Sequence, residues 1–224
     1  PDHGTGFFAE VAKMPDDPQA PVNGPEDDAL IFYTSGTEAR PKGVVVTFRE
    51  ALATVAPAAD MLALTASDRI LEFRSMNWFS AQIVSGLSSI YRGNTVILLR
   101  RFSQSRYFDL VRRYKATIGV CNPTGLAMFL NRPIAVTGAD VPHLRFMTSS
   151  SAPLSVEQWE RFERQYEIPV AQGYGCSEIG WIAGSNDTNR RFGSVGKPFP
   201  YLELRIIDEN GNAVPTGETG EVAL

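Results

Sequence analysis

The sequence predicts an α/β fold in which a layered, mostly parallel sheet is flanked by helices and followed by a small β subdomain at the C-terminal end. Short runs of β-branched and apolar residues alternate with longer amphipathic stretches, which is the pattern of layered α/β domains. The pattern changes after Gly193, where two strand-like runs follow one another without a helix between them. With 224 residues and 43% hydrophobic content, the chain can bury a sizeable core.

The first 28 residues are rich in proline and acidic residues, so we expect residues 1–28 to form a linker-like surface segment. The folded α/β unit is predicted to span residues 29–192. Its strands are predicted from β-branched and apolar runs, because such side chains suit a pleated, half-buried surface. The predicted strands are Leu30–Thr34, Val44–Val46, Ile70–Phe73, Thr95–Leu99, Thr117–Val120, Leu144–Met147 and the neighbourhood of Val170.

Helices are predicted between these strands, where apolar residues recur at three-to-four spacing. Ser155 and Gln158 have the spacing of a capping box at the start of the last helix. The predicted helices are Phe48–Leu62, Ser80–Tyr91, Tyr107–Tyr114, Thr124–Leu130 and Ser155–Tyr166.

Residues 193–224 are predicted to begin the small β subdomain. Leu202–Ile207 and Glu221–Leu224 have strand character, and the turn Asp208-Glu209-Asn210-Gly211 is predicted to join them. The second run reaches the last residue without a cap or a polar tail. We therefore expect the chain to be an internal part of a longer protein, truncated within this subdomain.

Composition argues against several classes of function. A formal net charge of -4 provides no general positive field, so nucleic acid is not expected as a partner. No apolar run approaches the length of a membrane span, and the N-terminus lacks the residue order of a signal peptide, so we expect a cytoplasmic protein. Cys121 and Cys176 are too few for a disulfide framework, and His3 and His143 give little support to zinc or His-triad catalysis.

A loop rich in hydroxyl groups and glycine carries the strongest chemical signal. It runs from Tyr33 to Gly43 with the sequence YTSGTEARPKG, between two predicted strands. Its hydroxyl and backbone N–H groups can donate to phosphate oxygens, and Lys42 supplies a mobile positive charge. It is not a Walker A loop, because Pro41 and Gly43 flank the lysine where that motif needs Gly and Ser or Thr. Taken alone, such a turn is equally well explained as a surface loop.

A second loop-like motif, Gly173-Tyr174-Gly175-Cys176-Ser177-Glu178, also departs from a known fingerprint. Glu178 stands where the dinucleotide-binding motif has its last glycine, and no long βαβ unit follows. A Rossmann dehydrogenase is therefore not expected.

Together and in this order, these motifs resemble the adenylate-forming superfamily, which includes acyl-CoA synthetases, luciferases and the adenylation domains of peptide synthetases. The resemblance extends from Ala29 onward. The phosphate loop of the family matches residues 34–43, its Gly-Gly-Ala-Pro-Leu turn matches residues 150–154, and its Tyr-Gly-x-Thr-Glu motif matches residues 174–178 with Ser177 in place of Thr. Its Gly-x-x-Gly-x-Pro segment and Gly-Glu strand match Gly193–Pro198 and Gly220-Glu221.

The resemblance implies roles for individual residues. Tyr174 would stack on adenine, Glu178 with Thr37 would bind Mg²⁺, and Lys42, Thr37 and Glu178 would be the catalytic residues. Without the resemblance, a half-buried aromatic at Tyr174 and a solvated or helix-capping carboxylate at Glu178 would be the favoured interpretations. The nucleotide-binding residues it implies are Thr34, Ser35, Gly36, Thr37, Lys42, Gly43, Ser151, Ala152, Pro153, Gln172, Gly173, Tyr174, Gly175 and Ser177.

Two departures from the family pattern affect these expectations. Glu38-Ala39 replaces the usual Thr-Gly of the phosphate loop and brings a carboxylate near the phosphates, so we expect a stiffer loop that still binds them. Ser150-Ser151 replaces the doubled glycine of the adenine turn, which makes a positive φ there less comfortable.

The acyl pocket of the family corresponds to Met76–Ser80 and to the loop Val120–Thr124, which are apolar and bulky here. No carboxylate lies nearby to pair with a buried ammonium, so we expect a carboxylic acid without an α-amino group. Ile179, Trp181 and Ile182 would close the far wall, although plain helix packing explains Trp78 and Phe79 equally well. The substrate-binding residues implied are Trp78, Phe79, Cys121, Gly173 and Ile179.

The reaction implied by the resemblance uses ATP, Mg²⁺ and CoA: a carboxylate attacks the α-phosphate to give an acyl-adenylate, and a thiol then displaces AMP. Residues 29–192 would then be the nucleotide- and acyl-binding unit of an acyl-CoA synthetase, an AMP-forming acid-thiol ligase. Two alternatives stay open: an adenylation domain that loads a carrier protein, and a module that binds nucleotide without chemistry.

Overall fold

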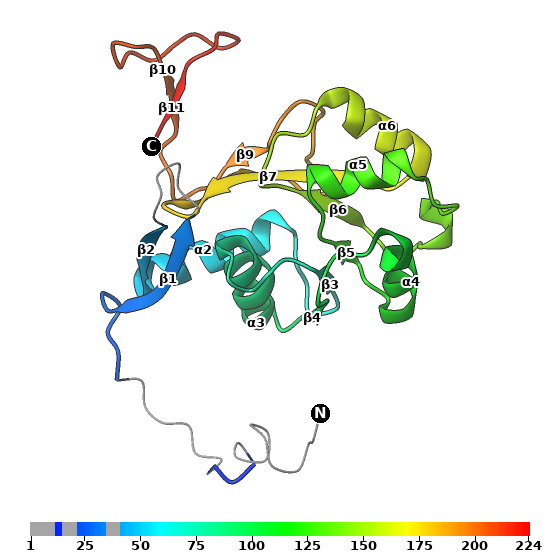
Figure 1. Cartoon of the computed structure of the whole chain (residues 1–224). Coiled ribbons are helices and arrows are strands. Elements are labelled where there is room, and N and C mark those ends of the chain that lie inside the picture. Colours follow the sequence, from blue (N-terminus) through cyan, green and yellow to red (C-terminus); the bar gives the residue numbers. More distant parts are fainter. Residues whose placement is uncertain (1–11, 15–21, 35–40) are drawn as a thin grey trace.

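The computed structural model describes residues 12–14, 22–34 and 41–224. Its main body is built on a seven-stranded sheet with the order β4-β3-β5-β6-β7-β8-β9 (Figure 1). The strands from β4 to β7 pair in parallel, whereas β8 and β9 are antiparallel additions at one side. The bounds are β3 Arg69–Glu72, β4 Thr95–Leu98, β5 Ile118–Gly119, β6 Phe146–Ser149, β7 Val170–Cys176, β8 Gly180–Gly184 and β9 Lys197–Pro198. The predicted α/β fold with a mostly parallel sheet is confirmed.

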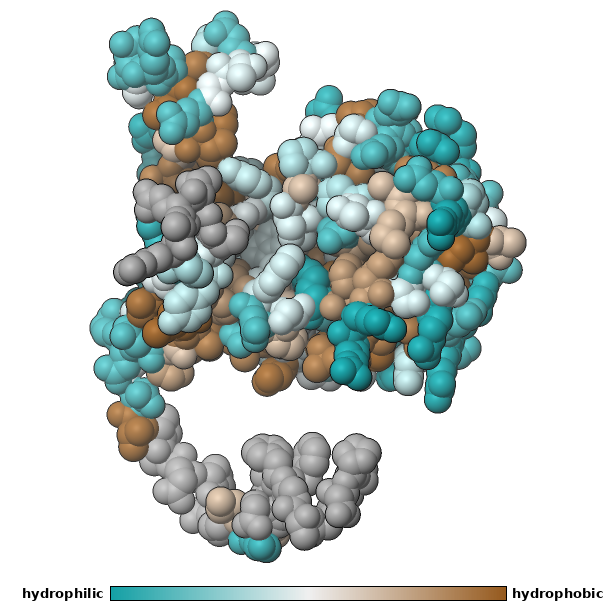
Figure 2. Space-filling model, in the orientation of Figure 1, coloured by the Kyte–Doolittle hydropathy of each residue, from teal (hydrophilic) through white to brown (hydrophobic). Residues whose placement is uncertain are grey.

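Helices cover both faces of the sheet because successive strand residues point to opposite faces. In β3, Leu71 packs with the aromatic core under α4, α5 and α6, whereas Ile70 packs with the apolar side of α2. In β6, Met147 likewise packs with the aromatic core, and Phe146 packs on the side of α2. Hydrophilic side chains predominate on the outer side of α4 and α6 (Figure 2). The helices of these two layers are α2 Phe48–Met61, α3 Ser88–Arg92, α4 Gln104–Tyr114, α5 Pro123–Asn131 and α6 Val156–Tyr166.

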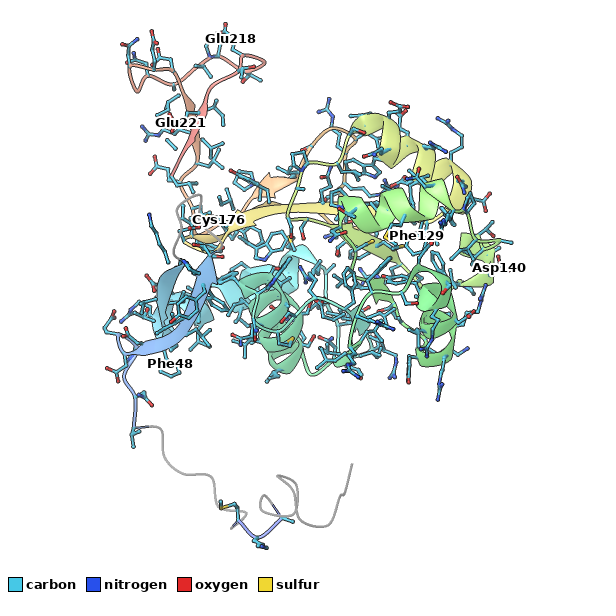
Figure 3. All side chains as sticks on the ribbon, in the orientation of Figure 1. Phe48, Phe129, Asp140, Cys176, Glu218 and Glu221 are labelled. Atoms are coloured by element: carbon cyan, nitrogen blue, oxygen red, sulfur yellow. The ribbon has the colours of Figure 1, made fainter. Side chains whose placement is uncertain are left out.

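The core beneath α4, α5 and α6 is mainly aromatic. Phe129 lies at its centre and contacts the rings of Tyr107, Phe108, Phe162 and Tyr166 at centroid separations between 5.1 and 6.3 Å (Figure 3). The hydroxyl of Tyr107 donates to Val120 O at 2.8 Å, and that of Tyr166 donates to Phe129 O at 2.9 Å. These buried hydroxyls are therefore paired, and the packed layer holds the ends of β5 and β6 in place.

A separate two-stranded hairpin, β1 Asp28–Thr34 and β2 Lys42–Thr47, leads into α2. The hydroxyl of Thr47 accepts from Glu50 N, and the Glu50 carboxylate accepts from Thr47 N at 2.8 Å, which closes a capping box. The hairpin ends with Thr34 opposite Lys42, so both ends of the predicted phosphate loop are fixed by strand pairing.

The last two strands form a hairpin that projects from the body, with Glu218 and Glu221 on it (Figures 1 and 3). β10 Arg205–Ile207 pairs with β11 Glu221–Ala223 as predicted. The prediction that the turn after Asp208 joins the two strands directly is wrong. That turn pairs Ala213 with Ile207, and the chain then continues through further residues before it reaches β11. β9 still pairs with β8, so residues 197–198 belong to the main sheet.

Two predicted elements differ from the observed ones. The helix predicted over Ser80–Tyr91 is a π-helix, η1 Ser80–Leu87, followed by α3, and the backbone N–H of Ser88 donates to Ile83 O, five residues back. The strand predicted over Leu144–Met147 begins two residues later, because Leu144 N donates to Val141 O and closes a turn. A short 3₁₀ turn, η2 Gly138–Asp140, precedes it.

The Tyr174–Glu178 motif was predicted as a loop, but its first residues belong to β7. Gly173–Cys176 pairs with Gly180–Gly184 of β8, a strand that the sequence did not predict. In the helix α6, Ser155 Oγ accepts from Gln158 N at 3.2 Å, which confirms the serine half of the predicted capping box. None of the helices in the described part of the chain is long and apolar enough to cross a membrane.

Candidate functional site

A cleft of about 470 Å³ lies where the carboxyl ends of the parallel strands meet the β1–β2 hairpin. Open α/β sheets place ligands at this edge. Its lining comes from the end of β1, the segment after β3, the segment after β6, and the β7–β8 hairpin. The lining residues are Phe32, Tyr33, Thr34, Asn77, Trp78, Phe79, Ser80, Ser150, Ser151, Gly173, Gly175, Cys176, Ser177, Gly180 and Trp181.

The adenine turn predicted from the sequence follows directly after β6. Ser150 is buried and Ser151 is exposed, and both line the cleft. Ser151 has φ = 76°, in the left-handed region that favours glycine. From the sequence we expected that serine in place of the family's glycine would make a positive φ unfavourable in this turn. Ser151 nevertheless adopts a positive φ.

The β7–β8 hairpin forms the opposite wall. Gly173 lies against the indole of Trp181, and a β-carbon on Gly173 would collide with that ring. Trp181 is itself fixed, because the hydroxyl of Tyr201 donates to Trp181 O at 2.5 Å. Only a glycine at position 173 leaves room for the Trp181 indole in its observed place.

Aromatic rings make up much of the remaining wall. Phe32 and Phe79 meet edge to face with centroids 5.3 Å apart. Trp78 is 49% exposed and Tyr33 is 72% exposed, so both rings are open to an incoming ligand. Aromatic faces of this kind bind flat or apolar groups, while the serine and threonine hydroxyls supply hydrogen bonds.

A small inner cavity of about 20 Å³ lies behind Trp181, which lines both spaces. Arg74, Ser85 and Gln172 also line the inner cavity. Arg74 and Glu72 form a buried ion pair with an Nη2–Oε2 distance of 2.7 Å and side-chain exposures of only 5% and 0%. This pair was not predicted, because Glu72 lies on the predicted strand Ile70–Phe73, Arg74 lies just beyond it, and no periodic or motif signal links the two charges.

The two cysteines lie in different environments. Cys176 is exposed and lines the cleft beside the end of the β1–β2 hairpin (Figure 3). Burial and the nearby Glu178 carboxylate raise the pKa of its thiol. Cys121 is completely buried in the aromatic core, where burial raises its pKa to about 12.

The structure brings only some of the predicted site residues together. Thr34, Trp78, Phe79, Ser151, Gly173, Gly175 and Ser177 line the cleft. Lys42 and Gly43 lie on β2, with Lys42 opposite Thr34. Ala152, Pro153, Tyr174, Glu178 and Ile179 are exposed beside the lining, Gln172 faces the inner cavity, and Cys121 is held in the core. Ser35, Gly36, Thr37, Glu38 and Ala39 lie outside the described residues.

The lining also includes residues that were not predicted as site residues. Phe32 lies on β1 just before the predicted phosphate loop, and Ser150 is the first residue of the predicted adenine turn, so both positions could have been selected. Asn77 and Ser80 lie in the segment that was predicted as an acyl pocket, but neither was selected. Trp181 was expected to close the far wall with Ile179 and Ile182; it lines the cleft, whereas Ile182 is buried and is not among the lining residues. Gly180 was not predicted, because its place depends on the pairing of β8 with β7, which the sequence did not reveal.

The site offers few groups for a metal ion. Among the described residues, no cluster of three or more His, Cys, Asp or Glu side chains could hold one. Glu178 is an exposed carboxylate in the turn that follows β7. A magnesium ion that bridges phosphates needs only one or two protein ligands, so this donor set fits Mg²⁺ bound mainly through a nucleotide.

Comparison with known proteins places the chain in context. A family model described as AMP-binding enzyme matches residues 3–224. The chain is 32% identical over 213 residues to the sulfoacetate–CoA ligase of Cupriavidus necator, covering 93% of this chain and 41% of that protein. It is 32% identical over 214 residues to the indoleacetate–CoA ligase of Aromatoleum aromaticum, covering 94% and 41%. The chain thus spans about 41% of the length of these curated relatives.

Among solved structures, the fold is similar to that of the anthranilate CoA ligase AuaEII in complex with anthranoyl-AMP. The TM-score is 0.84 at 26% sequence identity, and the match covers 99% of this chain and 44% of that chain.

Proposed function

Because the chain belongs to the family of AMP-binding enzymes, we propose that it forms the nucleotide- and acyl-binding part of an AMP-forming CoA ligase. The observation that carries the proposal is the cleft at the carboxyl edge of the sheet, where a hydroxyl-lined turn faces an aromatic wall. A nucleotide and a carboxylic acid would meet there. The names of the curated relatives, which are CoA ligases for different acids, support the same reaction type.

The hydroxyl-lined side of the cleft would hold the nucleotide. Thr34 and Ser177 face the cleft with hydroxyl groups that can donate to phosphate oxygens, and Lys42 lies opposite Thr34 on the hairpin. Ser151 would contact the base, together with Ala152 and Pro153 of the same turn. Tyr174 is 42% exposed, which leaves its ring available for stacking on adenine.

Mg²⁺ would be held by Glu178 and the nucleotide phosphates, where it would neutralise charge on the phosphate oxygens. The protein residues position the reactants. Trp78, Phe79 and Gly173 would enclose the acyl group so that its carboxylate faces the α-phosphate.

Two bond exchanges make up the proposed reaction. A carboxylate oxygen forms a bond to the α-phosphorus while the bond to pyrophosphate breaks, which gives the acyl-adenylate. The CoA sulfur then bonds to the acyl carbon, AMP leaves, and the thiol proton is released. The described residues contribute mainly by orientation and hydrogen bonding.

Residues 29–192 would form the binding unit and residues 193–224 would begin the small β subdomain. The protein would act in the cytoplasm. Transfer to a carrier protein in place of CoA is the alternative.

The proposal is tested by measuring pyrophosphate release in the complete natural protein that contains this chain. ATP, Mg²⁺ and a panel of carboxylic acids are supplied with and without CoA. We expect one class of acid to drive release, and CoA to convert that acid into a thioester. ATP binding without acid-dependent pyrophosphate release would instead identify a module that binds nucleotide without chemistry.

A further inference from the structure

The described residues on the acyl side of the cleft carry no charged side chain. Among the described residues that line the cleft, every side chain is aromatic, hydroxylic, amide, thiol or absent. Five of them are aromatic: Phe32, Tyr33, Trp78, Phe79 and Trp181. A ligand group buried among them would lose its water without gaining an ionic partner.

One cation lies directly behind this wall. Arg74 Nη1 donates to Ser80 Oγ at 2.9 Å, and Ser80 lines the cleft. Arg74 also lines the inner cavity behind Trp181. The guanidinium therefore contacts one lining residue of the cleft, Ser80, and borders a cavity that shares Ser150, Gly173 and Trp181 with the cleft.

Glu72 neutralises this cation almost completely. Its two carboxylate oxygens accept from Arg74 Nε at 3.0 and 3.2 Å, and Oε2 also accepts from Arg74 Nη2 at 2.7 Å. Ser85 Oγ donates to the same carboxylate at 2.5 Å, and Arg74 N donates to it at 2.7 Å. With both side chains buried and paired, the rear of the cleft presents no net charge.

We propose that the acid activated here carries an uncharged, ring-bearing group, and that Glu72 determines this selectivity by neutralising Arg74. This inference rests on the proposed function of the cleft. An aromatic ring gains edge and face contacts with Trp78, Phe79 and Trp181. A second carboxylate, a sulfonate or an ammonium would instead be buried without a counter-ion, since Arg74 and Glu72 are committed to each other.

The first experiment compares acids on the complete natural protein. Acid-dependent pyrophosphate release is measured with phenylacetate and benzoate as ring acids, hexanoate as an aliphatic acid, succinate and sulfoacetate as dianions, and carnitine as a cationic acid. We expect kcat/KM for the better ring acid to exceed that for the charged acids by about 100-fold or more. It should exceed that for hexanoate by about tenfold.

Two variants test the role of Glu72. Glu72→Gln removes the neutralising charge, so the ratio of kcat/KM for succinate to that for the ring acid should rise by about tenfold or more. The double variant Glu72→Gln with Arg74→Met removes both charges and leaves the rear of the cleft uncharged. The ratio of kcat/KM for succinate to that for the ring acid should therefore stay within about threefold of its value in the natural protein. Circular dichroism and thermal unfolding establish that each variant is folded.

The outcomes separate the two proposals. If no acid drives pyrophosphate release, the proposed function fails. If succinate, sulfoacetate or carnitine is the preferred acid, or hexanoate equals the ring acids, the ligase stands and the assigned substrate class is wrong. An unchanged succinate ratio in folded Glu72→Gln would overturn the role of Glu72. If Glu72→Gln does not fold, the double variant decides: loss of the preference for ring acids in the folded double variant would also overturn the role of Glu72.

Discussion

The indole of Trp181 occupies the space that a side chain at Gly173 would need. Gly173 pairs with Gly184 and Trp181 pairs with Gly175, so the indole reaches diagonally across the β7–β8 hairpin to Gly173, and both residues line the cleft. The shape of this wall of the cleft therefore depends on the contact between Gly173, which has no side chain, and the large indole of Trp181.

Gly173→Ala should move Trp181 and misplace the acyl group. A displacement of about 1 Å at a reacting group costs about 100-fold in rate, so we expect a loss of that order in kcat/KM for the acid, with the KM for ATP changed much less. Steady-state kinetics of pyrophosphate release against each substrate would show the difference. An equal loss for ATP and acid would mean that the whole cleft, and not the acyl side, had changed.

Lys42 and Glu178 are expected to act on the nucleotide. Lys42→Ala removes a charged hydrogen bond of about 2 kcal/mol, which corresponds to about 30-fold weaker ATP binding.

Glu178→Gln should instead raise the Mg²⁺ concentration needed for half-maximal activity. Titration calorimetry with ATP, and activity measured against Mg²⁺, check the two expectations. Because both side chains are exposed, thermal stability should stay unchanged, and a large loss of stability would point to a structural role.

Ser151 holds a left-handed backbone conformation that alanine tolerates less well than glycine. Ser151→Gly and Ser151→Ala both remove the hydroxyl, but only glycine relieves the strain. We expect the glycine variant to be more stable than the alanine variant by about 1 kcal/mol. Chemical denaturation of the two variants measures this difference, and equal stabilities would show that the loop relaxes without cost.

Asp68 ties three parts of the sheet edge together. Its carboxylate accepts from Thr117 Oγ1 at 2.6 Å, from Thr65 N at 2.8 Å, and from Arg145 Nη1 at 3.0 and 3.1 Å. Burial alone would raise its pKa, but the hydrogen bonds from Thr117, Thr65 and Arg145 outweigh burial and hold the pKa below its ordinary value. The carboxylate is therefore favoured in the folded state.

Because the folded pKa of Asp68 is lowered, its contribution to stability is full above the unfolded pKa of about 3.9 and is lost as the pH falls through the folded value. Asp68→Ala should lower the free energy of unfolding by about 3 kcal/mol near neutral pH. The difference between the two proteins should shrink in acid. Denaturation across this pH range tests the expectation, and a constant difference would exclude ionisation of Asp68 as the cause.

The two cysteines should differ sharply in reactivity. The thiolate is the reactive form, and Cys121 is both buried and shifted to a pKa of about 12, so iodoacetamide should label only Cys176 in the folded protein. Raising the pH should accelerate this labelling, because the pKa of Cys176 is raised from its usual value. Bound ATP and acid should protect Cys176, which mass spectrometry of labelled peptides would quantify. Labelling that ligands do not slow would place Cys176 outside the occupied site.

The strands and the helices were largely predictable because their signals are local. In β3, the adjacent apolar residues Ile70 and Leu71 indicate a strand buried on both faces, and the structure places them in separate cores. Ser155 likewise marks the start of α6 by its own hydrogen bond. The cleft could be anticipated from the motif around Ser151 and from the strand that ends at Thr34.

Features that depend on distant contacts could not be predicted in this way. The π-helical geometry of η1 accompanies the contacts of Ser80 with Arg74 and of Ser85 with Glu72, which no local pattern reveals. The contact of the Trp181 indole with Gly173 follows from the pairing of β8 with β7, which no local pattern reveals. Cys121 follows a buried strand, and the sequence does not tell whether such a residue faces the cleft or the core.

The most direct test of acyl-adenylate formation is mass spectrometry of the products that the complete natural protein makes from ATP, Mg²⁺ and its preferred acid in the absence of CoA. We expect the acyl-adenylate and pyrophosphate to form together, and the adenylate to disappear when CoA is added. Formation of ADP and an acyl phosphate, or ATP binding with no product from any acid, would contradict the proposed reaction.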